Sequence, residues 1–321
     1  MKKIAIERSF VSADALAELI NEEYDLGDVP SCKLFTKMLR TQDNDHYLVR
    51  LEGEKQYVAR VYQIGRYLSR ERSDYEFEME WLTYLYENGH NVGYPIRRVD
   101  GGFLGALDAP EGVRYYGIFN YVEGTEMSIN QPGLLYRLGQ CMARIHLASE
   151  GFETDKKRNP WDLEHLIDIP IDRVKRNWSE KRAADFDLLL ASADDAKEQV
   201  LDLLGNDKSP NVWGVIGGDF NNVNAFVTQN QDLNFINFDL CGYGWFAYDI
   251  AVFLVNTQLL NRPVELSEAF FAGYFSERPL SEAEHEAIEP FMTLRRIWLT
   301  GSFAMGGGFA GHTFIASAVH E

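Results

Sequence analysis

The chain changes its hydrophobic pattern near residue 124, and this change constrains the fold more than any other feature. Before it, residues 46–53 and 55–63 alternate apolar and polar side chains on either side of a tight turn, which is typical of antiparallel strands. After it, apolar residues recur at the spacing of one helix face, as at Leu134, Leu138, Met142 and Ile145. The pattern therefore predicts an α+β fold.

A chain of 321 residues is long enough for two lobes. We expect residues 1–123 to form a lobe with an N-terminal helix, an antiparallel sheet and one long helix. Residues 124–321 are predicted to form a largely helical lobe with a polar hairpin at 213–240. A cleft between two lobes is a preferred place for a ligand.

The composition narrows the class of partner. A net charge of −18 argues against nucleic acid, whose phosphates attract clustered Lys and Arg. The same charge favours a cationic small molecule, although solubility alone also explains it. No apolar run is long enough to span a membrane, and three separated cysteines (Cys32, Cys141 and Cys241) fit a reducing cytoplasm. We expect a cytoplasmic protein that binds small molecules.

Acid and amide side chains gather between residues 217 and 244. Asp219 and Asn224 flank a loop between a strand end and a strand start. Such a loop can aim a carboxylate at a hydroxyl group and an amide oxygen at Mg²⁺, as the catalytic loop of a kinase does. A hydrogen-bonded turn rich in Asp and Asn explains the same residues without any chemistry. Both interpretations are open for this segment taken alone.

The next polar residues are Asn237 and Asp239, which we expect at the end of a regular strand. Side chains two residues apart then lie on the same side, about 6–7 Å apart. Together with Asp219 and Asn224 they would bring four oxygen-bearing side chains to one rim. Asp249 begins an apolar helix, where a carboxylate also stabilises the N-terminus by its charge.

These motifs resemble the aminoglycoside phosphotransferase and choline kinase-like family of small-molecule kinases, especially its bacterial phosphotransferase branch. In that family a His-Gly-Asp-x-x-x-x-Asn loop precedes an Ile-Asp-Phe/Trp strand end and a Tyr-Asp-Leu-Ala helix. The counterparts here are Gly217-Gly218-Asp219 with Asn224, then Ile236-Asn237-Phe238, then Tyr248-Asp249-Ile250-Ala251. Upstream, the family order continues with the strand 57–62, the helix around Glu78, the hinge-like segment 117–127 and the helix 138–146. Matches in this order over most of the chain are a specific signal.

The resemblance implies a protein-kinase-like two-lobe fold that uses ATP, or another nucleoside triphosphate, with Mg²⁺. Asp219 would be the catalytic base or would orient the acceptor hydroxyl, and Asp249 would brace its loop. The metal ligands would be Asn224 and the second-strand residue, here Asn237, with Asp239 as a further candidate.

On the nucleotide side, the resemblance implies that Arg60, paired with Glu78, contacts the α- and β-phosphates. Backbone groups of the hinge, at Asn120 and Val122, would meet the adenine. The acceptor would be a small-molecule hydroxyl on an aminoglycoside-, amino-alcohol- or homoserine-like compound, and the enzyme a monomer or homodimer.

The chain departs from the family pattern at three positions. Gly217 stands where the family has His, Arg60 where it frequently has Lys, and Asn237 where it has a metal-binding Asp. An amide oxygen can ligate Mg²⁺ but brings no negative charge, which could cost on the order of 10²–10⁴ in rate. Asp239 would compensate if the strand bends, or it caps the following turn. Two hypotheses follow: an active kinase, or a catalytically impaired pseudokinase that binds a nucleotide or metabolite or regulates a partner.

Overall fold

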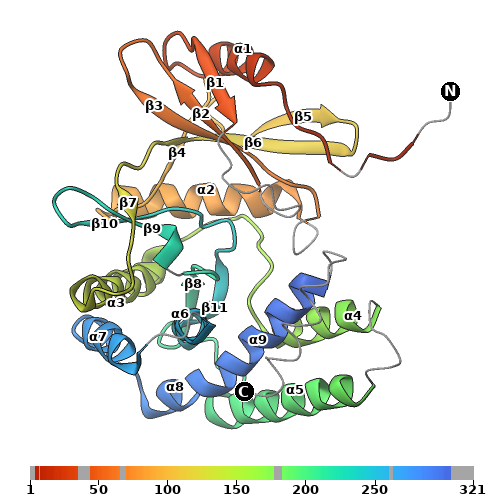
Figure 1. The fold of residues 1–321 in the computed structure, drawn as a ribbon, viewed down its shortest axis with the longest axis vertical. Helices are drawn as coiled ribbons and strands as arrows, with labels where there is room; N and C mark the ends of the chain where they lie inside the picture. The colour runs from red at the N-terminus through yellow and green to blue at the C-terminus, as the bar shows by residue number, and fades with distance from the viewer. Residues whose placement is uncertain are drawn as a thin grey trace. The chain divides into compact units, whose positions relative to one another are not determined.

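The structure is a computed structural model that describes residues 4–6, 8–34, 44–65, 70–176, 183–220, 222–259 and 263–304. Its contacts divide the chain into two compact units (Figure 1). Unit 1 comprises Met1–Glu123 and Thr154–Lys157, and unit 2 comprises Gly124–Glu153 and Arg158–Glu321. The division into lobes 1–123 and 124–321 remains a prediction.

Unit 1 is built on one antiparallel sheet. In chain order its elements are α1 (Ala13–Glu23), β1 (Ser31–Leu34), β2 (Asp45–Arg50), β3 (Gln56–Val61), α2 (Arg72–Glu87), β4 (Pro95–Ile96), β5 (Gly105–Ala109) and β6 (Gly112–Asn120). The strands pair in the order β1-β2-β3-β6-β4, with β5 on β6, and every pairing is antiparallel. This sheet carries the strand expected to hold the phosphate-binding cation.

The two faces of β3 serve different purposes. Ala59 and Val61 point into an apolar core that includes Leu16 and Ile20 of α1. Since side chains alternate across a strand, Arg60 lies on the opposite face, where it meets Glu78 of α2. The amphipathic helix α1 thus closes one face of the sheet and leaves the charged residue on the other.

Unit 2 is mainly helical within its described residues. Its helices are α3 (Pro132–Ala148), α4 (Ile169–Arg176), α5 (Ala183–Leu204), α6 (Phe246–Leu259), α7 (Val264–Phe275), α8 (Glu282–Glu286) and α9 (Ile288–Ala304). Its short strands are β7 (Thr125–Glu126), β8 (Trp213–Ile216), β9 (Ala225–Val227), β10 (Leu233–Phe235) and β11 (Gly242–Trp245). The predicted α+β fold, strand-rich first and helical second, is confirmed. No described helix is long and apolar enough to cross a membrane.

The predicted hairpin at 213–240 takes a different form. Strands β9 and β10 make a hairpin, and β7 joins β9 at its other edge. Strand β8, however, pairs with β11, which lies beyond the hairpin in the chain. The loop after β8 is therefore anchored by β11 and the start of α6 rather than by its immediate successor.

Candidate active site

The loop after β8 is held by the Asp249 carboxylate, in the first turn of α6. The backbone N–H groups of Gly217 and Gly218 donate to its two oxygens at 2.7 and 2.8 Å. Gly218 has φ +71°, and a Cβ there would collide with the Leu240 carbonyl and the Trp161 ring, so only glycine fits. Asp249 thus occupies the place expected of a loop brace.

A buried histidine supports Asp249 in turn. His146 Nε2 lies 3.3 Å from Asp249 Oδ2, and His146 Nδ1 lies 2.8 Å from the Tyr274 hydroxyl. Burial lowers the pKa of His146, although the contact with Asp249 opposes the shift, so the ring is neutral at pH 7. Because a carboxylate only accepts, Nε2 carries the hydrogen and the Tyr274 hydroxyl donates to Nδ1.

The close packing of α3 against α7 places this histidine. A Cβ at Gly139 would collide with the Phe270 carbonyl, and one at Gly273 would collide with the Tyr136 carbonyl. Glycine at both positions lets the two helix backbones approach, which brings His146 and Tyr274 together.

Asp219 follows the two glycines, and most of its polar atoms are occupied. Its Oδ1 forms an ion pair with Arg295 of α9, and its carbonyl accepts from Asn224 Nδ2 at 3.0 Å. Arg295 also donates to the Gly218 carbonyl at 3.3 Å. Within the described residues Asp219 Oδ2 has no partner, and the side chain is 26% exposed. One carboxylate oxygen is therefore open.

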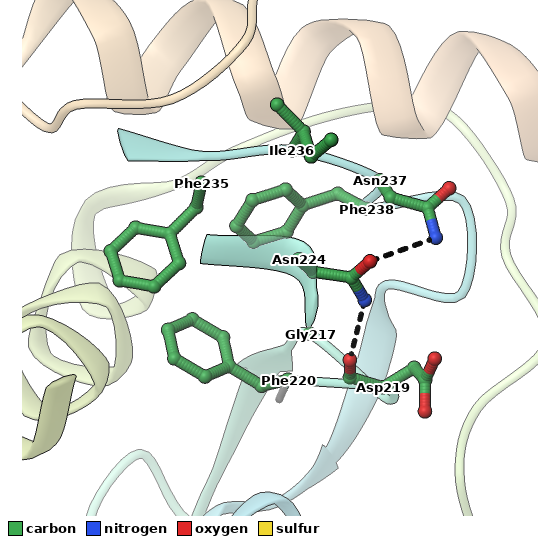
Figure 2. Close-up of a pocket in the computed structure, with 8 residues that line it drawn as sticks. All are labelled: Gly217, Asp219, Phe220, Asn224, Phe235, Ile236, Asn237 and Phe238. Carbon is green, nitrogen blue, oxygen red and sulfur yellow. Dashed lines mark hydrogen bonds between the residues drawn. The ribbon is translucent and has the colours of Figure 1, made fainter. Parts of the chain in front are cut away.

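Asn224 and Asn237 form an amide pair beside Asp219 (Figure 2). Asn224 Nδ2 is used by the Asp219 carbonyl, so its Oδ1 is the acceptor, and Asn237 Nδ2 donates to it at 3.3 Å. Within the described residues, the one polar side-chain atom of the pair that has no hydrogen-bond partner is Asn237 Oδ1. One small pocket is lined by Gly217, Asp219, Phe220, Asn224, Phe235, Ile236, Asn237 and Phe238. Three of the four predicted oxygen-bearing residues thus share one pocket.

The expectation of a regular strand through residues 237 and 239 is wrong. β10 ends at Phe235, and Asn237 has φ +66°, a left-handed conformation that Asn tolerates better than most residues. The chain therefore turns, and Asp239 is buried outside the pocket lining. Arg158 binds this turn by donating to the carbonyls of Asp239 and Cys241 at 2.5 and 2.6 Å. A metal-binding role of Asp239 remains a prediction.

In unit 1, Arg60 forms a buried pair with Glu78. Arg60 Nη1 lies 2.6 Å from Glu78 Oε1, and the Tyr62 hydroxyl donates to Oε2 at 3.0 Å. The Arg60 guanidinium also lies 4.5 Å from the centre of the Phe119 ring. Burial acts to lower the pKa of Arg60, but Glu78 and Tyr62 outweigh it and raise the pKa, so Arg60 is cationic.

The two hinge residues lie at the end of unit 1. Asn120 ends β6, and its backbone N–H donates to the Tyr94 carbonyl at 3.0 Å. Its side-chain oxygen accepts from the Tyr94 N–H at 2.6 Å. Val122 is half-buried beyond the strand. The Asn120 N–H is thus used within unit 1.

Sequence reasoning missed two of these groups, Arg295 and Tyr62. Arg295 lies 76 residues after Asp219, and nothing in its helix spacing distinguishes it from other arginines. Tyr62 follows Arg60 on alternate positions of one strand face, and that period-2 relation could have identified it. His146 ends the helix 138–146 predicted from the sequence, and its place on an apolar helix favours a packed residue over a ligand.

Residues 36–290 match the phosphotransferase enzyme family, and the chain belongs to that family. It is 32% identical to an uncharacterized protein of Deinococcus radiodurans, over 92% of this chain and 83% of that protein. It is 26% identical to a homoserine kinase of Agrobacterium fabrum, over 87% of this chain and 80% of the relative.

Solved structures share the fold. An amicoumacin kinase bound to AMP-PNP, Ca²⁺ and its ligand aligns with a TM-score of 0.78 at 18% identity, covering 96% of this chain and 92% of that one. A microcompartment-associated aminopropanol kinase aligns with a TM-score of 0.74 at 24% identity, covering 96% and 93%. The predicted kinase-like fold is confirmed, and the predicted enzyme class, a small-molecule phosphotransferase, is confirmed at the level of the family.

Proposed function

We propose that this protein transfers the γ-phosphate of ATP to a hydroxyl group of a small molecule. The observation that carries the proposal is the state of Asp219: Oδ1 is occupied by Arg295, while Oδ2 is open beside the Asn224–Asn237 amides. A fixed carboxylate with one open oxygen is suited to hold an acceptor hydroxyl in line for attack.

The other residues take supporting roles in this proposal. Asp249 holds the loop through the Gly217 and Gly218 N–H groups. Arg60, oriented by Glu78, contacts the nucleotide phosphates as a cation. Asn120 and Val122 lie in the segment proposed to meet the base.

The donor set fits a magnesium ion that arrives with a nucleotide. Asn224 and Asn237 offer hard amide oxygens, and Mg²⁺ needs only one or two protein ligands beside phosphates and water. Neither amide is charged, and within the described residues no three His, Cys, Asp or Glu side chains form a metal-binding group. We therefore propose Asn224 and Asn237 as the residues that would hold the ion, which would supply neutralisation of phosphate charge.

The proposed acceptor is a hydroxyl compound that also carries an amine. Relatives and structural neighbours are named for homoserine, amicoumacin and aminopropanol. A net charge of −18 favours a cationic acceptor over an anionic one. The family and its relatives, which are named as kinases, do not favour the pseudokinase alternative.

The test is a product assay. The protein is incubated with ATP, Mg²⁺ and a panel of homoserine, aminopropanol, other amino alcohols and aminoglycosides, and phosphorylated product is detected by mass spectrometry. We expect product with at least one amine-bearing acceptor, and we expect Asp219→Asn to lower kcat by about 10²–10⁴-fold. No product with any acceptor, combined with no thermal shift on adding ATP and Mg²⁺, would contradict the proposal.

A further inference from the structure

Arg295 of α9 lies against the residue that the proposed reaction depends on. Its side chain is 2% exposed, and its guanidinium contacts both the Asp219 carboxylate and the Gly218 carbonyl. We propose that Arg295 is a positioning residue, which fixes Asp219 Oδ1 so that Oδ2 is the oxygen that receives the acceptor hydroxyl. This inference rests on the proposed function.

Three contacts fix Asp219, two of them to its own atoms and one to the residue before it. Arg295 Nη2 holds Oδ1, Arg295 Nη1 holds the preceding carbonyl at Gly218, and Asn224 Nδ2 holds the carbonyl of Asp219 itself. A planar guanidinium spans a carboxylate and a carbonyl through N–H groups in a fixed fork, whereas an ammonium is a compact charge on a flexible stem. The carboxylate therefore has little freedom to rotate, and a substrate meets one defined oxygen.

The surroundings keep Arg295 charged and in place. Its guanidinium lies 4.6 Å from the centre of the Trp298 ring, and Trp298 packs at 5.4 Å from the ring of Trp161. Burial acts to lower the pKa of Arg295, but Tyr248 and Asp219 outweigh burial and raise it. Asp219 thus faces a permanent cation on one side.

A buried pair of this kind is a poor choice for stability alone. Removing two charges from water costs several kcal/mol per ion, and well-packed apolar residues often stabilise a protein equally or better. Asp219 is moreover partly exposed, so the pair is asymmetric: the arginine is enclosed and the carboxylate is accessible. That asymmetry is what orientation of a reactive carboxylate requires.

In the proposed reaction the acceptor oxygen forms a bond to the γ-phosphorus, and the bond from that phosphorus to the nucleoside diphosphate breaks with its electron pair. The acceptor proton passes to Oδ2. Since Arg295 occupies Oδ1, the hydroxyl has one place to bind, in line with the phosphate. A carboxylate free to rotate would present either oxygen and would spend most of its time misaligned.

The first test separates position from charge. Arg295→Met keeps the volume of the side chain and removes both contacts, and Arg295→Lys keeps the charge but not the fork. We expect kcat to fall roughly 10²-fold for Met and roughly tenfold for Lys, with KM for ATP unchanged within about twofold. A kcat of Arg295→Met within about twofold of the parent protein would overturn the proposal, as would a rise in KM for ATP as large as the fall in kcat.

Arg98→Met is the matched control. Arg98 of unit 1 makes the same two kinds of contact, with the Glu23 carboxylate at 3.2 Å and the Leu104 carbonyl at 2.6 Å, but it lies outside the proposed machinery. We expect it to lower Tm and leave kcat unchanged. An equal loss of kcat in both variants would show a general effect of losing a partly buried arginine and would overturn a specific role for Arg295.

The second test needs no activity and uses a stability cycle. Asp219→Asn leaves Arg295 buried without its counter-charge, so we expect a clear loss of Tm. Adding Arg295→Met to that variant should restore part of the loss, because the unpaired cation is gone. Additive losses in the double variant would overturn the pairing. If the cycle shows coupling while the acceptor panel gives no product, the pairing stands and the proposed function fails.

Discussion

Each unit contains a buried arginine–carboxylate pair, and the two pairs differ in which member is left open. In unit 1 the Glu78 carboxylate is fully enclosed, with Oε1 bound by Arg60 and Oε2 by Tyr62. In unit 2 the Asp219 carboxylate is 26% exposed, with Oδ1 bound by Arg295 and Oδ2 open. In unit 1 the carboxylate holds the arginine that we propose to bind phosphate. In unit 2 the arginine holds the carboxylate that we propose to bind the acceptor hydroxyl.

Asp249 strengthens this contrast because it is a third carboxylate with a purely supporting role. Its two oxygens accept from Gly217 N–H and Gly218 N–H, and His146 adds a further contact. Glu78 and Asp249 are thus both satisfied on their two oxygens, as expected from the cost of an unpaired buried acceptor. Asp219 differs from these two carboxylates, because it is partly exposed and its Oδ2 has no partner within the described residues.

The largest effect expected from the comparison comes from removing the proposed phosphate-binding cation of unit 1. Arg60→Met alone would strand the buried Glu78 charge, so it is combined with Glu78→Gln. We expect kcat/KM for ATP to fall about 10²-fold, because a cation that stabilises phosphate charge is lost.

Glu78→Gln alone is the control, since it keeps Arg60 and a hydrogen-bonding side chain of the same shape. Its kcat/KM for ATP should fall by less than about tenfold, because the glutamine oxygen still accepts from Arg60. If Glu78→Gln lowers kcat/KM for ATP as much as the double variant does, Glu78 itself contributes to nucleotide binding. The proposal that Glu78 only orients Arg60 is then wrong.

A smaller effect is expected at the amide pair of unit 2. Asn237→Asp replaces the Nδ2 donor by a second acceptor facing Asn224 Oδ1 and adds a negative charge to the pocket. Without a divalent cation we expect Tm to fall by a few degrees, corresponding to about 1 kcal/mol. With Mg²⁺ or Mn²⁺ the loss should be recovered, because a cation between the two oxygens replaces the lost hydrogen bond.

Asn234→Asp is the matched control, because Asn234 lies in β10 of the same hairpin and does not line the pocket. Its Tm should not depend on the divalent cation. Equal cation dependence in both variants would indicate general charge screening and remove Asn237 from the proposed metal ligands. A large gain in ATP turnover in Asn237→Asp would indicate that the natural residue limits catalysis.

The part of the site that could be predicted from the sequence is the part formed by local motifs. Asp219, Asn224 and Asn237 line one pocket, as their spacing predicts, because short loops and a hairpin bring near neighbours together, while their roles stay predictions. The expected strand position of Asp239 was wrong, because the sequence does not reveal the left-handed φ of Asn237, and β10 ends at Phe235. Side chains alternate between the two faces of a strand only for residues that lie within the strand.

Arg295 could not be predicted for a different reason. Its contact with Asp219 depends on the packing of α9 against other helices of unit 2, and no local pattern encodes that packing. The fold was easier to predict than the site. The alternating and helical hydrophobic patterns each extend over many residues, so a few local exceptions do not change the prediction.

The smallest effect is expected at Tyr62, which completes the enclosure of Glu78. Burial raises the pKa of Tyr62 far above its usual range, so its hydroxyl remains a donor to Glu78 Oε2. Tyr62→Phe should lower the free energy of unfolding by about 1–3 kcal/mol, because one oxygen of a buried carboxylate loses its donor. KM for ATP should change by less than about threefold, since the Arg60–Glu78 contact remains.

Tyr47→Phe is the control, because the Tyr47 hydroxyl of β2 donates to a neutral acceptor, the Val11 carbonyl, at 2.8 Å. Its loss of stability in urea unfolding should be the smaller of the two, since bonds to charged groups are worth about twice as much. A rise in KM for ATP in Tyr62→Phe as large as that of the Arg60 double variant would mean that the second oxygen of Glu78 orients Arg60 as strongly as the first. Glu78 would then take part in nucleotide binding rather than only orient Arg60, and the contrast between the two pairs would fail.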